Sequence, residues 1–134
     1  MEIEAELSKV IINENADQQI IVIKEKKGHR SFPVVIGMFE IFAIDRYLKG
    51  IELPRPMTHD LINRIISGLG AEITRIVISD LKNHTFYATM HIHQNGQSYQ
   101  IDCRPSDAIA LSVTANAPVY VAEHVFDLTS DQSL

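Results

Sequence analysis

The sequence predicts an α+β fold: a single domain over residues 1–134, with a mixed, mostly antiparallel sheet and three main helices packed on it. Segments typical of strands come in runs with helical segments between them, which favours α+β over strict strand–helix alternation. The dipeptide Asn95-Gly96, set between two alternating segments, is the strongest short signal for a β-hairpin. With 46% hydrophobic and 22% charged residues, the 134-residue chain is long enough for one core and short for two.

Three strands are expected before the first helix. Residues 3–12 alternate loosely between apolar and polar side chains. Residues 18–25 contain four consecutive β-branched aliphatic residues, which is typical of a strand covered on both faces. Residues 29–36 are expected to form the third strand, and Pro33 within it favours an edge position or a bulge because proline has no N–H to donate to a sheet.

Two helices follow. The first is expected over residues 38–49, and apart from Asp45, Arg46 and Lys49 it is mostly apolar, so we expect it to be largely buried. The second is expected over residues 58–69, after a proline-rich loop. Its apolar stripe has helical spacing and should face the core; it consists of Leu61, Ile62, Ile65, Ile66 and Leu69.

The remaining elements complete the sheet. Three antiparallel strands are expected, over residues 71–82, 85–94 and 97–103. The core face of the middle strand should carry Phe86, Ala88, Met90 and Ile92. A third helix over residues 107–115 is made of small and apolar side chains and should be buried. A short strand over 118–122 and a helical segment over 122–128 come last.

Composition narrows the function classes. No apolar run approaches the roughly 18 to 20 residues of a membrane span, and the acidic N-terminal segment lacks the basic-then-apolar order of a signal peptide. The single cysteine, Cys103, excludes an internal disulfide and favours a reducing cytoplasm. A formal net charge of -5 lacks the basic surplus typical of proteins that live on nucleic acid.

The start of the second helix, in the segment PRPMTHDL, contains residues typical of a helix N-terminus together with side chains that could take part in acid–base chemistry or ligand binding. Thr58 is expected at the N-cap, where its hydroxyl accepts a backbone N–H, and Asp60 suits the positive end of the helix. Capping does not explain His59, which lies within about 20° of Ile66 on the helical wheel, over the apolar stripe. Two interpretations stay open: a buried histidine with one satisfied nitrogen, or an acid–base group or ligand.

The segment IDCRPSDAIAL repeats this order before the third helix. It contains an Arg-Pro pair, a hydroxyl cap at Ser106 and a first-turn Asp107. Pro105 forces Arg104 into an extended conformation and directs its side chain away from the helix. Arg55 and Arg104 thus precede two helix N-termini, which are potential anion sites, since guanidinium groups grip phosphate oxygens. Alternatively, both arginines pair with nearby carboxylates and stiffen their loops.

Carboxylates beside both arginines argue against a simple phosphate cradle, because Asp60 and Asp107 would repel an anion. An Mg²⁺ or Mn²⁺ ion held by these carboxylates and bridging to a phosphodiester would resolve the conflict. Glu40 is a third candidate ligand because it faces away from the solvent side of its helix, although such a glutamate more commonly accepts backbone N–H groups. His91 and His93 share a solvated strand face, and we interpret them as surface residues.

Four segments resemble, in order, the bifunctional nuclease family: IGMFEIFAIDRYLKGIELPRPMTHDLI, ISDLKNHTFYATMHI, IDCRPSDAIALSV and APVYVAE. The match runs from about Val34 to Glu123, and the two Arg-Pro blocks and the TFYA segment are its most specific parts. The resemblance implies an α+β domain assembled as a homodimer or larger ring, cleavage of both DNA and RNA, and divalent-metal dependence. Cys103 stands where the family commonly has alanine, and the segment SVTAN lacks a basic residue often found there, which lowers the local positive charge.

We therefore expect metal-assisted hydrolysis of phosphodiester bonds in DNA and RNA, with little sequence specificity and no membrane association. The expected catalytic residues are His59, Asp60 and Asp107. Substrate phosphates are expected to bind Arg55, Arg104, Thr58 and Ser106, and the metal to bind Asp60, Asp107 and Glu40. The competing hypothesis is a non-catalytic oligomeric binding or regulatory domain. A cluster gathered in one open cleft favours the nuclease, and arginines that are fully paired and buried favour the alternative.

Overall fold

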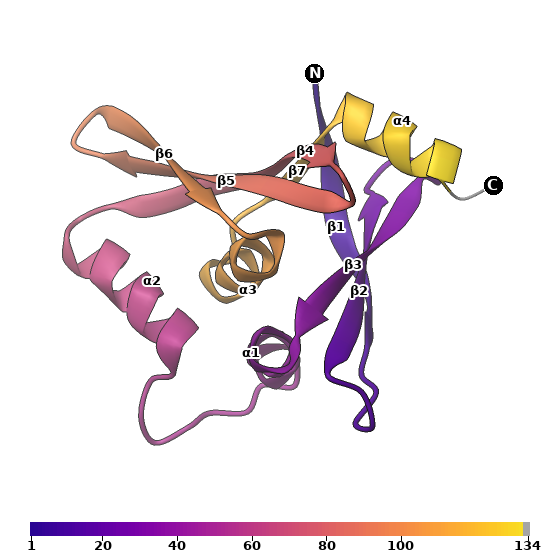
Figure 1. Ribbon diagram of the computed structural model, residues 1–134. Coiled ribbons are helices and arrows are strands. Elements are labelled where there is room, and N and C mark those ends of the chain that lie inside the picture. Colours follow the sequence, from indigo (N-terminus) through magenta and orange to yellow (C-terminus); the bar gives the residue numbers. More distant parts are fainter. Residues whose placement is uncertain (133–134) are drawn as a thin grey trace.

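The computed structural model describes residues 1–132, in which seven strands and four helices follow one another (Figure 1). The elements are β1 (Glu2–Ile11), β2 (Gln18–Glu25), β3 (Ser31–Gly37), α1 (Met38–Leu48), α2 (Thr58–Gly68), β4 (Glu72–Lys82), β5 (Thr85–Gln94), β6 (Gln97–Cys103), α3 (Pro105–Ala115), β7 (Val119–Ala122) and α4 (Glu123–Gln132). None of these helices is long and apolar enough to cross a membrane.

The described strands form one mixed sheet in the order β3-β2-β1-β7-β4-β5-β6. Neighbouring strands are antiparallel except β4 and β7, which are parallel. β3 lies at one edge, as Pro33 predicts. β6 lies at the other edge and forms a hairpin with β5 through Asn95 and Gly96, which both have positive φ, as a tight hairpin turn requires. The predicted α+β class and mostly antiparallel sheet are confirmed.

The sheet curls so far that its β3 edge approaches β5. Phe32 of β3 and Phe86 of β5 stack with ring centroids 5.2 Å apart, although β2, β1, β7 and β4 lie between their strands in the sheet. Phe126 of α4 meets Phe32 edge-on, with centroids 5.4 Å apart. Figure 1 shows the β1–β3 half of the sheet turned steeply against the β4–β6 half, with α3 in the angle between them. This curl gathers the buried side chains into one core.

α3 is the central helix of the domain and packs against α1, α2, β3, β4 and β5. It is buried as predicted, and its small residues Ala108 and Ala110 allow neighbouring elements to approach closely. It begins at Pro105, two residues earlier than predicted, because proline's fixed φ suits the first position of a helix. Asn116 ends it in the left-handed conformation, with a φ of 56°.

α1 is less buried than predicted. Ile41 and Ile44 are completely buried, but Phe39 and Phe42 are 86% and 47% exposed. The prediction of a largely buried α1 is wrong because the helix contacts the core along one stripe and presents a second apolar face to the outside.

α2 and β2 differ from the predictions in the same way. Only Ile62 and Ile66 of the α2 stripe pack against the core, whereas Leu61, Ile65 and Leu69 are exposed. In β2, Ile21 and Ile23 are fully buried, while the two aliphatic residues on the opposite face are only partly covered. The four β-branched residues therefore do not reflect cover on both faces of the strand.

Candidate active-site groove

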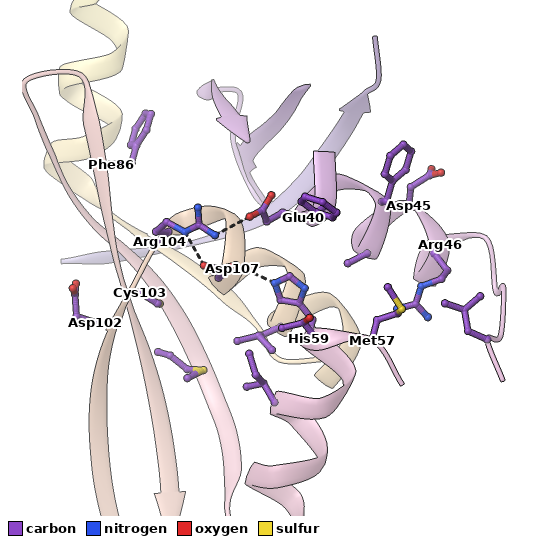
Figure 2. Close-up of a pocket in the computed structure, with 18 of the residues that line it drawn as sticks. Glu40, Asp45, Arg46, Met57, His59, Phe86, Asp102, Cys103, Arg104 and Asp107 are labelled. Carbon is purple, nitrogen blue, oxygen red and sulfur yellow. Dashed lines mark hydrogen bonds and ion pairs between the residues drawn. The ribbon is translucent and has the colours of Figure 1, made fainter. Parts of the chain in front are cut away.

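A groove of about 1150 Å³ opens where the first turns of α1, α2 and α3 meet the ends of β5 and β6. Its walls are largely apolar and include Phe39, Phe42, Leu53, Met57, Ile62 and Met90. Its polar lining includes Glu40, His59, Arg104 and Asp107 from the starts of the helices, and Asp45, Arg46 and Asp102 from elsewhere (Figure 2). Ligand sites in proteins commonly combine such apolar walls with a few convergent polar groups.

Four of these polar side chains form one hydrogen-bonded chain (Figure 2). Arg104 Nε donates to Asp107 Oδ2 at 2.8 Å, and Arg104 Nη2 donates to Glu40 Oε1 at 2.7 Å. The other oxygen of Asp107, Oδ1, lies 3.0 Å from Nε2 of His59. These four residues, Glu40, His59, Arg104 and Asp107, are termed the Arg104 cluster. Three helices that are distant in sequence thus contribute to one site.

Helix geometry explains where the carboxylates of this region lie. Each of the three helices has an acidic residue at its third position: Glu40 in α1, Asp60 in α2 and Asp107 in α3. The positive end of a helix stabilises a carboxylate there. Asp60 Oδ2 accepts the backbone N–H of Met57 and a hydrogen bond from Arg46 Nη2, each at 2.9 Å. Glu40 and Asp107 instead hold Arg104, so Asp60 does not belong to the Arg104 cluster.

The predicted hydroxyl caps are not formed. Thr58 is the first residue of α2, after an N-cap at Met57, and Ser106 is the second residue of α3, after Pro105. Neither hydroxyl makes a capping hydrogen bond. The predictions of Thr58 and Ser106 as N-caps are wrong because the N-cap positions are taken by Met57 and Arg104, so both hydroxyl residues lie inside the first turn.

Arg104 is an exposed side chain of the groove that binds a buried carboxylate. Glu40 and His59 are each only 8% exposed, whereas the side chain of Arg104 is 68% exposed. A buried carboxylate without a partner is costly, so Glu40 depends on the guanidinium. Arg104 Nη1 has no hydrogen-bond partner among the described residues and is therefore available to a ligand in the groove.

The charges of the cluster keep Asp107 ionised. Burial raises the pKa of Asp107, but hydrogen bonds from Arg104 and His59 outweigh this effect and hold the pKa below its usual range. The hydrogen bond to Asp107 in turn raises the pKa of Arg104. A carboxylate at Asp107 accepts a hydrogen bond from Nε2–H of His59, and when the ring is neutral this tautomer leaves Nδ1 unprotonated.

Nδ1 of His59 is not sealed from solvent, although the residue as a whole is only 8% exposed. It makes no hydrogen bond with the described residues, and among those residues no side-chain nitrogen or oxygen is sealed without a partner. His59 therefore combines a ring that Asp107 orients with a second nitrogen that has no partner among the described residues. Burial raises the pKa of the thiol of Cys103, which also lines the groove, to about 11, and this disfavours the reactive thiolate.

The structure gathers some of the predicted site residues and separates others. His59, Asp107, Arg104 and Glu40 meet in the Arg104 cluster, and Thr58 lines the same groove. Asp60 pairs with Arg46. Ser106 is buried and lines a smaller hollow of about 460 Å³, to which Arg104 also contributes. Arg55 is exposed, lines neither hollow and forms no ion pair or hydrogen bond within the described part of the chain.

Sequence reasoning missed several residues of the groove, among them Phe39, Phe42 and Arg46. Phe39 and Phe42 belong to the helix that is predicted to be largely buried, and Arg46 is predicted on the solvent side of that helix. The helical wheel does carry a signal for the two phenylalanines, because Ile41 and Ile44 point to a different face of α1. A helix lying on a sheet buries one stripe, so a second apolar stripe indicates another use.

Of the predicted metal ligands, Glu40 and Asp107 both contact Arg104, and Asp60 does not join them. Within residues 1–132, no group of three or more His, Cys, Asp or Glu side chains is placed to hold a metal ion. The guanidinium of Arg104 lies between the carboxylates of Glu40 and Asp107, and Asp60 is paired elsewhere. An ion at this position would compete with a side chain that is always charged.

Comparison with known proteins identifies the family. The family model described as the bifunctional nuclease domain matches residues 21–133. An uncharacterised protein of Mycobacterium tuberculosis is 36% identical over 114 residues, which are 85% of this chain and 68% of that protein. Bifunctional nuclease 2 of Oryza sativa subsp. japonica is 24% identical over 114 residues, and bifunctional nuclease 1 of the same plant is 20% identical over 118. These matches cover 82% and 85% of this chain but only 35% and 36% of the two plant proteins. The chain belongs to the bifunctional nuclease domain family.

Proposed function

We propose that this chain hydrolyses phosphodiester bonds of DNA and RNA with little sequence specificity. The observation that supports the proposal is the Arg104 cluster: a histidine oriented by a carboxylate lies beside an exposed arginine in an open groove. A positioned acid–base group next to a donor for developing negative charge is the combination that phosphoryl chemistry uses. Membership of the bifunctional nuclease domain family supports the same reaction class.

The geometry suggests a role for each group. Arg104 Nη1 donates to a phosphate oxygen and stabilises the charge that grows on it. His59 Nδ1 takes a proton from the attacking water as the new oxygen–phosphorus bond forms. The ester bond to the leaving oxygen breaks, and that oxygen takes a proton from solvent. Asp107 keeps the His59 ring in the tautomer with Nδ1 free. None of these contacts reads a base, which fits a broad substrate range.

The sequence also suggests that Mg²⁺ or Mn²⁺ assists the reaction, and we propose this separately from the steps above. The steps above use no metal, because Arg104 lies where an ion between Glu40 and Asp107 would bind. Rates measured with Mg²⁺, with Mn²⁺ and with a chelator test the proposal. Activity that needs either ion would mean that substrate or a displaced Arg104 completes a metal site.

The test of the nuclease proposal is a cleavage assay on purified protein with linear DNA and RNA. His59→Ala should lower the rate by about 10²-fold or more, since a positioned acid–base group contributes about that much. The chain offers a matched control, because His124 Nε2 lies 3.1 Å from Asp80 Oδ1 in a similar but exposed pair outside the groove. His124→Ala should leave the rate within about twofold of the unchanged protein.

Two results would count against the proposal. Cleavage that survives His59→Ala, Asp107→Asn and Arg104→Ala together would place the chemistry elsewhere. Cleavage that separates from the protein on a sizing column would belong to a contaminant.

A non-catalytic oligomeric domain is the second candidate, and the outer face of α2 favours it. Leu61, Ile65 and Leu69 are exposed on this face, which is typical of a surface that a partner covers. We propose that the chain forms a homodimer or larger homo-oligomer through it, whether or not it is catalytic. Light scattering should show Ile65→Glu to be smaller than the unchanged protein. In a purely regulatory oligomer, the Arg104 cluster would bind a small anion without cleavage.

The free thiol of Cys103 bears on location. Because disulfides form in oxidising compartments and thiols persist in reducing ones, we propose that the chain works in the cytoplasm. Cell fractionation tests this proposal.

A further inference from the structure

We propose that the groove binds single-stranded nucleic acid, with an unpaired base stacked on Phe39 and Phe42 and the neighbouring phosphate on Arg104. The inference rests on the proposed function and names its substrate class. It adds two residues of α1 that the hydrolytic steps do not use.

The aromatic wall is the first observation. Phe39 is 86% exposed and directly precedes Glu40, and Phe42 is half exposed one turn further along α1. Both rings line the same groove as Arg104. Exposed rings next to a phosphate-binding donor match the alternation of base and phosphate along a single strand. Stacking of one base on such a ring is worth roughly 5- to 150-fold in affinity and tolerates every base.

The charge of the groove argues against a duplex. Its lining carries two basic side chains, Arg46 and Arg104, and four acidic ones, Glu40, Asp45, Asp102 and Asp107. Arg46 is itself paired with Asp60. Proteins that grip duplexes neutralise many phosphates with lysine and arginine, and a whole-chain net charge of -5 offers no such surplus. One phosphate donor and an apolar wall suit an unpaired strand better.

The course of the surface fits a continuous strand. Thr85, Phe86 and Arg104 line both the large groove and the smaller hollow beside the β3 edge. Arg104 therefore stands at a junction that is open on two sides. A strand held at Arg104 has room for nucleotides both before and after the bound phosphate, which predicts cleavage within a strand as well as at its ends.

The chain contains no tryptophan, so Phe39→Trp introduces a single fluorescent reporter in the groove. A single strand of about 12 nucleotides, within the site sizes of such proteins, should quench its emission by stacking, at a several-fold lower concentration than the matching duplex. Tyr47→Trp is the matched control, because Tyr47 lies on the same helix, is 46% exposed and does not line the groove. Its emission should not change.

Unlabelled variants give a second readout. Phe39→Ala should weaken binding of a fluorescein-labelled single strand by roughly 5- to 150-fold, and Phe39→Tyr should restore most of it. Equal quenching by strand and duplex, or no quenching, overturns the inference. Blue-shifted emission of Phe39→Trp that depends on protein concentration also overturns it, since a second copy would then cover the ring.

Cleavage by the unchanged protein separates the two proposals. If cleavage occurs without quenching or a preference for single strands, this inference fails and the proposed function stands. Selective quenching without any cleavage supports single-strand binding and overturns the nuclease proposal.

Discussion

Two arginines in this chain each hold several carboxylates, and their surroundings are opposite. Arg30 pairs with Glu25, Glu123 and Asp127, which we term the Arg30 cluster together with the arginine. Its side chain is 32% exposed and lies over the buried ring of Phe126, 4.9 Å from the ring centroid. Arg104, by contrast, is 68% exposed and reaches inward to the buried Glu40.

The difference in exposure between the two arginines indicates the role of each cluster. Arg30 joins α4 to the turn between β2 and β3, and most of its acidic partners face water, so the cluster is a clamp between elements. Arg104 binds its acidic partners through Nε and Nη2, and Nη1 has no partner among the described residues. An ion pair alone therefore does not identify a ligand-binding site. A paired side chain that is largely exposed and keeps a free donor does indicate one.

In each cluster, a glycine lies next to the carboxylate that binds the arginine. A Cβ at Gly28 would lie 2.7 Å from Glu25 Oε2, and a Cβ at Gly37 would lie 2.6 Å from Glu40 Oε2. In each case the missing side chain makes room for the carboxylate that holds the arginine. The two clusters can therefore be perturbed in matched pairs.

The largest difference should be in catalysis. Arg104→Ala should lower kcat/KM for DNA by about 10²- to 10³-fold, the usual cost of losing a donor to developing charge. Arg30→Ala should change it by less than about twofold, since the Arg30 cluster lies outside the groove. Arg104→Lys should not restore activity, because one ammonium cannot hold Glu40, Asp107 and a phosphate at once. Equal losses for Arg30→Ala and Arg104→Ala would erase the distinction.

The next difference is in stability. Arg104→Ala leaves Glu40 buried without its partner and should lower the free energy of unfolding by about 1–3 kcal/mol. Adding Glu40→Gln should recover part of that loss, because a neutral amide is easier to bury than a carboxylate. Urea denaturation measures both variants. Recovery of cleavage in the double variant would contradict the assignment of Arg104 to phosphate binding.

A smaller effect, on the cleavage rate, is expected from substituting the glycine of the Arg104 cluster and not from substituting the glycine of the Arg30 cluster. Gly37→Ala should push Glu40 away from Arg104 and lower the cleavage rate by about tenfold, since small displacements in a site are costly. Gly28→Ala makes the same kind of clash with Glu25 and should leave the rate unchanged. Steady-state kinetics on the two variants provides the comparison, and an inactive Gly28→Ala would mean that the clashes act through general destabilisation.

The features predicted correctly from sequence are those set by neighbouring residues. Asn95 and Gly96 determine a hairpin turn by their own backbone preferences, and Pro33 determines an edge strand by its missing N–H. The exposed faces of α1 and α2 depend instead on how far the sheet curls. That curl brings Phe32 to Phe86 across the sheet, and no local pattern encodes such a contact.

The two Arg-Pro segments show the same limit within the site. Pro105 is the first residue of α3, so Arg104 lies at the helix mouth, three residues before Asp107. After Arg55, two further residues precede the start of α2, and its side chain stays outside the groove. Similar segments in the sequence thus have different surroundings, because the helices start at different offsets from the arginine.

The smallest expected difference is in how the free energy of unfolding depends on pH in the acidic range. Burial raises the pKa of Asp107, but hydrogen bonds from Arg104 and His59 leave it lowered overall, and the hydrogen bond from Arg30 lowers the pKa of Glu25. The unfolded chain therefore binds more protons than the folded chain below the ordinary values of about 3.9 for Asp and 4.3 for Glu. Stability from both groups is complete above those values and is lost as the pH falls through the lowered pKa values of the folded chain.

Asp107→Asn and Glu25→Gln should each flatten the dependence of the unfolding free energy on pH in this acidic range, as measured by urea midpoints. At neutral pH the two variants should then differ in one respect. Asp107→Asn should lose cleavage, because an amide that donates to His59 stabilises the wrong tautomer, while Glu25→Gln should keep it. A pH curve for Asp107→Asn parallel to that of the unchanged protein would show that Arg104 does not stabilise this carboxylate, and the Arg104 cluster would lose its central ion pair.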